Sequence, residues 1–121
     1  MKRAVANHSQ GGSSLHYLCL KSEIPKGCSK SFSISDKKGL KEDVALFNID
    51  GRFYAISNMC AHEGGPLSQG ALEKTIVTCP WHGWQYDVRN GKSPHPGGDS
   101  VKSFNVKTIG NKLYVVLLTS S

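Results

Sequence analysis

Short apolar segments of strand length, separated by turn dipeptides, run through most of the chain. Two of them flank Asp50-Gly51, a dipeptide that favours a primed hairpin turn because such a turn needs positive φ at its centre. No segment has a sustained 3.6-residue apolar period, so we expect at most one short helix, over Lys37–Asp43. The pattern predicts an all-β fold, an antiparallel sandwich or barrel. The predicted strands are Leu15–Leu20, Ser31–Ser35, Val44–Ile49, Arg52–Ile56, Thr75–Thr78, Trp84–Val88, Val101–Val106 and Leu113–Leu118.

The chain has 121 residues, which is enough for one domain. Residues 1–14 are polar and rich in Gly and Ser, so we expect a flexible tail followed by a single domain over 15–121. The longest apolar run is six residues, Leu113–Leu118, far below the ~18 that a membrane helix needs. No secretory signal is recognisable, so we expect a cytoplasmic protein, or an organelle protein whose transit peptide was removed.

The formal net charge is +6, and no run of basic residues is longer than two. A nucleic-acid-binding stripe is therefore not expected; we expect a solvated surface with a positive bias, and the functional alternative is steering towards an acidic partner. Of the four cysteines, Cys19 lies in a strand-like run and is expected to be a buried thiol. Cys28 lies in a predicted loop, and no disulfide between these two is expected.

Two segments that do not resemble strands, Ser57–Gly70 and Cys79–Gly83, each hold one cysteine and one histidine. The pattern is Cys60-x-His62, sixteen residues, then Cys79-x-x-His82. Two Cys and two His could close a tetrahedral zinc site, but zinc fingers usually pair Cys with Cys and His with His. Here each loop supplies one of each type, which favours two adjacent metals, one bound by both cysteines and the other by both histidines.

These residues and their neighbours resemble the motif of the Rieske [2Fe–2S] family. The segments that carry the resemblance are Cys60-Ala-His62, Gly64-Gly65-Pro66-Leu67, Cys79-Pro-Trp-His82 and Gly83-Trp84-Gln85-Tyr86-Asp87. The resemblance implies that Cys60 and Cys79 bind one iron and that His62 and His82 bind the other. It also implies an antiparallel β fold with a small two-loop cluster-binding subdomain, about 57–92, and a third covering loop over Ser93–Ser100. Within that loop, we expect His95 to be an exposed loop histidine.

With this ligand set, the implied cluster is neutral when oxidised and carries one negative charge when reduced. An electron enters a neutral centre more easily than the dianionic four-cysteine cluster, so the potential is expected to be higher than that of plant-type ferredoxins.

Four neighbouring positions refine that expectation. In the high-potential members of the family a disulfide joins the two loops, and its positions here are Gly65 and Trp81, which cannot form one. A serine that hydrogen-bonds a bridging sulfide corresponds to Trp84, whereas a tyrosine that donates towards a cysteine sulfur is matched by Tyr86. Fewer hydrogen bonds to sulfur predict a potential in the lower part of the Rieske range.

The resemblance implies a soluble, monomeric one-electron carrier, not an enzyme, that connects a flavin reductase with an oxygenase or similar acceptor. After the motif only His95 remains as a histidine, so the chain lacks the ligands of a catalytic mononuclear iron. The alternative is a small subunit similar to that of NADH-dependent nitrite reductase. A zinc-binding interaction module is a third possibility, from a different functional class.

Overall fold

The structure is a computed structural model that describes residues 13–35, 39, 41–60, 65–81 and 83–118. Most of the predicted tail therefore lies outside the described residues, as do His62 and His82. Ser13 and Ser14, which the sequence assigns to the tail, belong to the first strand.

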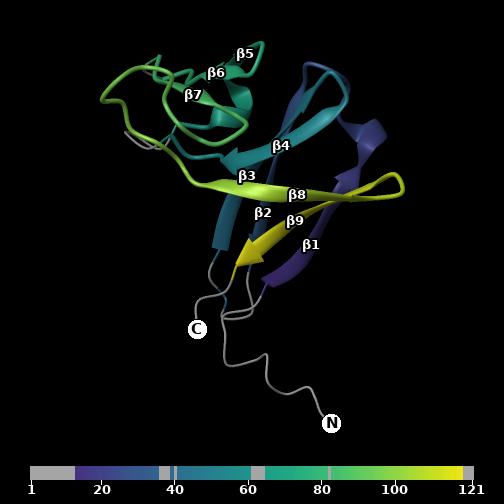
Figure 1. Cartoon of the computed structure of the whole chain (residues 1–121). Coiled ribbons are helices and arrows are strands. Elements are labelled where there is room, and N and C mark those ends of the chain that lie inside the picture. The colour runs from purple at the N-terminus through teal and green to yellow at the C-terminus, as the bar shows by residue number, and fades with distance from the viewer. Residues whose placement is uncertain (1–12, 36–38, 40, 61–64, 82, 119–121) are drawn as a thin grey trace.

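The described residues form two antiparallel sheets (Figure 1). The larger one has six strands in the order β1-β9-β8-β4-β3-β2 and curls towards a barrel, whereas the smaller one has the order β5-β6-β7. This arrangement confirms the predicted all-β antiparallel class. The strands of the large sheet are β1 (Ser13–Leu20), β2 (Ser29–Ser35), β3 (Lys41–Ile49), β4 (Arg52–Ser57), β8 (Ser103–Ile109) and β9 (Lys112–Leu118). Those of the small sheet are β5 (Ala71–Glu73), β6 (Ile76–Thr78) and β7 (Gln85–Asp87), and the 3-10 turns are η2 (Lys21–Glu23) and η3 (Leu67–Gln69).

Strand β3 divides the interior into two cores. Successive side chains of a strand point to opposite faces, and Val44 and Leu46 pack with Leu113 and Val115 of β9 inside the curled sheet. Ala45 and Phe47 face the other way and pack with residues of the small sheet. The continuous apolar run of β3 is thus explained by burial on both faces, and the second core lies between the two sheets.

The predicted turn at Asp50-Gly51 is confirmed. Asp50 has φ 51° and Gly51 has φ 91°, as a primed turn requires, and the turn joins β3 directly to β4. The predicted helix over Lys37–Asp43 is wrong where the structure describes it, because Lys41–Asp43 form the start of β3 and pair with β2. Cross-strand pairing outweighs the weak local helix signal there.

The two cysteines outside the motif agree with their predictions. Cys19 is buried, Cys28 is exposed, and neither forms a disulfide. Burial raises the pKa of the Cys19 thiol, and the carboxylate of Glu23 raises it further. No described residue belongs to a helix long and apolar enough to cross a bilayer.

Candidate metal centre

Two of the four predicted ligands, Cys60 and Cys79, are described, and both lie in the core between the sheets. Cys60 follows β4 and is 3 % exposed, and Cys79 follows β6 directly and is 2 % exposed. Phe47 of the large sheet and Tyr86 of the small sheet belong to the same buried cluster. The structure therefore brings the two thiols from separate segments into one apolar environment.

Backbone hydrogen bonds close the first loop at its base. The Cys60 N–H donates to the Gly65 carbonyl (2.8 Å), and Met59 and Pro66 form an isolated β-bridge. The Leu67 N–H donates to the Asn58 carbonyl (2.7 Å). These bonds fix both ends of the segment that contains the predicted Cys60-x-His62 pair.

The second loop is closed in the same manner. The Cys79 N–H donates to the Trp84 carbonyl (2.7 Å), and the Gly83 N–H donates to the Cys79 carbonyl (3.0 Å). Gly83 has φ 77°, a left-handed conformation that glycine adopts without steric cost. The loop therefore begins and ends at the same point of the small sheet, and Trp81 lies at its tip.

Tyr86 connects the core to the first cysteine. Its side chain is fully buried in β7, opposite Val77 of β6. Its hydroxyl lies 3.2 Å from the Cys60 sulfur, within hydrogen-bond distance for a sulfur acceptor. The sequence left open whether Tyr86 packs or hydrogen-bonds, and the structure shows both.

Gly65 lies against the second loop. A Cβ atom placed on Gly65 would be 2.8 Å from the Cys79 sulfur and 3.0 Å from Cγ of the Trp81 ring. Only a residue without a side chain fits there unless the sulfur or the ring shifts. Gly65 therefore lies next to both cysteines. Its carbonyl accepts from the Cys60 N–H, and its Cα faces the Cys79 sulfur.

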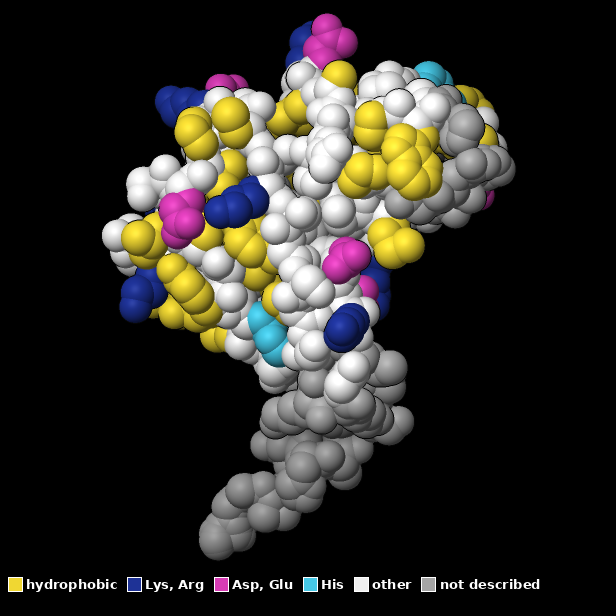
Figure 2. Space-filling model, turned by 180° about the vertical axis from the view of Figure 1, so that it is seen from behind, with side chains coloured by type: hydrophobic (Ala, Val, Ile, Leu, Met, Phe, Trp, Pro, Cys, Tyr) yellow, Lys and Arg dark blue, Asp and Glu magenta, His cyan; other side chains and the backbone are white. Residues whose placement is uncertain are grey.

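The two tryptophans have different environments. Trp84 is partly buried and packs against the core that contains the cysteines. Trp81 is 57 % exposed although one part of its ring contacts Gly65. In Figure 2, hydrophobic side chains form a group at the small-sheet end of the molecule and also lie over the large sheet, whereas Lys, Arg, Asp and Glu are intermixed over the visible face.

His95 is exposed, as the sequence predicts, but it has a specific partner that the sequence does not reveal. Its Nε2 lies 2.6 Å from Oε1 of Gln85, an atom that can only accept, so this nitrogen donates. The amide of Gln85 donates in turn to the Thr78 hydroxyl (3.2 Å), one residue before Cys79. Gln85 therefore attaches the third loop to the small sheet, and only its place within the motif could have drawn attention to it.

The donor set fits a sulfur-ligated metal group. The site contains two buried thiols, and the Tyr86 hydroxyl lies close to one of the two sulfurs. At position 65, a glycine leaves room for the other sulfur. This combination is suited to thiolate ligation of a metal. Among the described residues no cluster of three or more His, Cys, Asp or Glu is present. His62 and His82 lie outside that set, so their placement remains a prediction.

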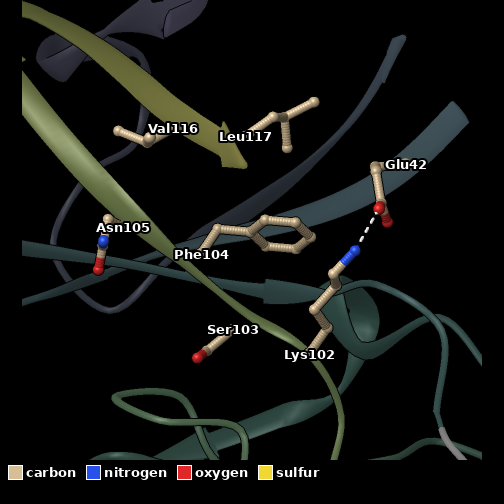
Figure 3. A pocket seen from close by; sticks show the side chains of 7 residues that line it. All are labelled: Glu42, Lys102, Ser103, Phe104, Asn105, Val116 and Leu117. Atoms are coloured by element: carbon tan, nitrogen blue, oxygen red, sulfur yellow. Dashed lines mark hydrogen bonds and ion pairs between the residues drawn. The ribbon is translucent and has the colours of Figure 1, made fainter. Parts of the chain in front are cut away.

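A separate pocket of about 300 Å³ lies beside β8 and β9, and Figure 3 shows its lining. Lys102 and Glu42 form an ion pair of 2.5 Å at one side, and the ammonium lies 5.6 Å from the centre of the Phe104 ring. None of the described residues that line the pocket is a cysteine or a histidine.

Comparison with known proteins identifies several similar chains. The Rieske [2Fe-2S] domain family matches residues 14–115. The 3-phenylpropionate/cinnamic acid dioxygenase ferredoxin subunit of Photorhabdus laumondii is 29 % identical over 103 residues, which are 84 % of this chain and 92 % of that protein. Human apoptosis-inducing factor 3 is 40 % identical over 73 residues, 60 % of this chain but only 12 % of that protein.

Two solved structures extend the comparison. The ferredoxin in the complex of reduced oxygenase and oxidized ferredoxin of carbazole 1,9a-dioxygenase is 25 % identical. It superimposes with a TM-score of 0.70 over 82 % of this chain and 98 % of its own. The putative NADH-dependent nitrite reductase small subunit of Mycobacterium tuberculosis has a TM-score of 0.74 over 88 % of this chain and 96 % of its own. At 18 % identity, that likeness concerns the fold alone.

Proposed function

Because the chain belongs to the Rieske [2Fe-2S] domain family, we propose that it is a one-electron carrier that receives electrons from a flavin reductase and passes them to an oxygenase. The proposal rests on the near full-length similarity to a dioxygenase ferredoxin subunit and to the ferredoxin of an oxygenase complex. The family carries a [2Fe–2S] cluster bound by two Cys and two His, and the chain itself is not the catalytic component. A cluster of this kind accepts and releases one electron at a time.

The proposed ligands are Cys60, His62, Cys79 and His82. What supports the two cysteines is their burial in one core and the closure of each loop by its own backbone bonds. The histidines are proposed from their spacing within the motif alone. The single observation that carries the cysteine assignment is the Tyr86 hydroxyl at 3.2 Å from the Cys60 sulfur, since a buried hydroxyl at this distance can donate to a thiolate and stabilise its negative charge.

We place the potential in the lower part of the Rieske range. Tyr86 supplies one hydrogen bond towards sulfur, but Gly65 and Trp81 occupy the two positions of the loop disulfide, and Trp84 occupies the position of the serine and has no hydroxyl. Fewer such donors leave the reduced state less stabilised.

The partner surface is proposed to be acidic, because the chain carries a formal net charge of +6. Electron transfer that slows as salt is added supports this, and a rate independent of salt contradicts it. We expect the protein in a reducing compartment, the cytoplasm or an organelle.

The function can be tested by reconstitution with the reductase and the oxygenase of a 3-phenylpropionate dioxygenase system. The proposal predicts that the chain, in place of the native ferredoxin, restores product formation, and that the Cys79→Ser variant does not. A cluster-loaded chain that dithionite reduces but that exchanges no electrons with either component contradicts the carrier function. Stable co-purification with a nitrite reductase large subunit would instead support the subunit alternative.

A further inference from the structure

Gly65 and Trp81 form a contact between the two loops that the carrier function does not by itself require. Gly65 belongs to the first loop, where its carbonyl accepts from the Cys60 N–H at 2.8 Å. Its Cα faces the second loop, so closely that a Cβ there would lie 3.0 Å from Cγ and 3.1 Å from Cδ2 of Trp81. These two ring atoms are neighbours, so the glycine lies against the pyrrole edge of the indole.

The same glycine position also borders the sulfur of Cys79, at 2.8 Å from the hypothetical Cβ. The indole, the glycine and the sulfur therefore meet at one point. Glycine is the residue that fits at position 65, because the ring and the sulfur together occupy the volume that a side chain would need. Cys79 is only 2 % exposed, so little of this residue is open to water on the side where the indole lies.

Trp81 reaches this position from a rigid base. Its loop is closed by the bonds between Cys79 and Trp84 and between Cys79 and Gly83, of 2.7 and 3.0 Å. More than half of the side chain is nonetheless exposed, at 57 %. The exposure of so large an apolar side chain is explained if the buried part of the indole has a function at the contact with Gly65.

We propose that Trp81 is a positioning residue that holds the two loops together through its contact with Gly65 and shields the Cys79 sulfur from water. This contact between Trp81 and Gly65 is called the clasp below. The proposal rests on the proposed function in one respect, namely that Cys79 is a cluster ligand. Hydrogen bonds and solvent at the sulfurs set the potential of an iron–sulfur cluster, so the clasp affects both the retention of the cluster and its potential.

Removal of the indole has two expected effects. In Trp81→Ala, water reaches the sulfur and stabilises the more negative reduced state, so the potential rises, and the visible absorbance decays several-fold faster in air. In Trp81→Phe, the smaller ring still covers the glycine, so both properties return most of the way to the wild-type values. Met59→Ala is the matched control, because Met59 is also a large apolar side chain, 53 % exposed, next to a cysteine of the other loop.

The measurement is redox titration of the cluster-loaded wild type and the three variants, together with the half-life of the visible absorbance. A merely structural role would alter the half-life and leave the potential unchanged. The proposal is refuted if the potential of Trp81→Ala equals that of the wild type, whatever its half-life, or if Met59→Ala changes the potential and the half-life equally.

A second measurement does not need the cluster. The chain has only two tryptophans, so in a Trp84→Phe background the fluorescence reports Trp81 alone. Adding Gly65→Ala should displace the indole and increase its quenching by acrylamide. Unchanged quenching would overturn the contact itself. Because this readout is independent of iron, a failure of the carrier proposal and a failure of the clasp can be told apart.

Discussion

The Tyr86 hydroxyl lies 3.2 Å from the sulfur of Cys60, inside a core that excludes solvent from both side chains. The tyrosine is positioned by the small sheet, whereas the cysteine follows a strand of the large sheet. The contact therefore depends on how the two sheets pack and not on either loop alone.

Tyr86→Phe should lower the reduction potential, because it removes a donor to sulfur and keeps the buried ring. One hydrogen bond contributes about 0.5–1.5 kcal/mol, which corresponds to roughly 20–60 mV for a one-electron couple. Redox titration of the two proteins measures the shift. Tyr114→Phe, on the edge-to-face ring pair with Tyr17, serves as a control and should leave the potential unchanged. An unaltered potential in Tyr86→Phe would show that the hydroxyl does not stabilise the reduced state.

Replacing a predicted histidine ligand tests the charge argument. His62→Cys or His82→Cys would add a thiolate, so the cluster would carry one more negative charge in each oxidation state. The potential should then fall towards that of plant-type ferredoxins, on the order of 100 mV or more. The comparison is valid for variants that still contain two irons, and an unchanged potential in such a variant would disprove the argument.

Gly91 and Gly97 have nearly the same positive φ, 78° and 79°, but different surroundings. A Cβ on Gly91 would collide with the carbonyl oxygen of Val101, whereas one on Gly97 would meet no atom of the described residues within 4 Å. Gly97→Ala should therefore cost only the left-handed strain, about 1–2 kcal/mol of unfolding free energy. Gly91→Ala should cost about 1–3 kcal/mol more, because it also overpacks the base of the third loop. Equal losses in urea titration would contradict the packing seen there.

The free energy of unfolding should fall in acid as Asp87 becomes protonated. The Arg89 side chain donates to its carboxylate at 2.7 and 3.0 Å, and this bonding holds the pKa of Asp87 below its usual value. A depressed pKa in the folded state stabilises the fold above the unfolded pKa, near ~3.9, and the contribution disappears as the pH drops through the folded pKa.

The expected size of this effect is about 0.5–1 kcal/mol, because Arg89 is largely exposed. Urea titrations of wild type and Asp87→Asn at pH 7 should differ by that amount, and the difference should shrink below about pH 4. A difference that is constant from pH 7 to pH 3 would show that the carboxylate charge is not responsible.

The local signals in the sequence proved sufficient for much of the fold. Asp50-Gly51 predicted its turn because the required φ values are a property of those residues. The short strand Ala71–Glu73 was not predicted, since it exists only through pairing with Ile76–Thr78. The start of β3 was mistaken for a possible helix for the same reason, because its pairing with β2 lies outside any local window.

In the candidate site, too, local sequence signals predicted some features, and others depend on how distant segments pack. The spacing of Cys60 and Cys79 within their pairs is visible in the sequence, and it predicted two loops that meet. The approach of Gly65 to the Cys79 sulfur and the attachment of His95 to Gln85 depend on how those loops fold, so neither could be read from the residues alone.

The central claim is a cluster with mixed cysteine and histidine ligation at these loops. The most direct measurement is a low-temperature electron paramagnetic resonance spectrum of the dithionite-reduced protein, together with iron and zinc analysis. The account predicts two irons per chain and an average g value clearly below that of all-cysteine [2Fe–2S] clusters. A colourless, silent protein that contains zinc after anaerobic purification, or a spectrum of the all-cysteine type, would contradict it.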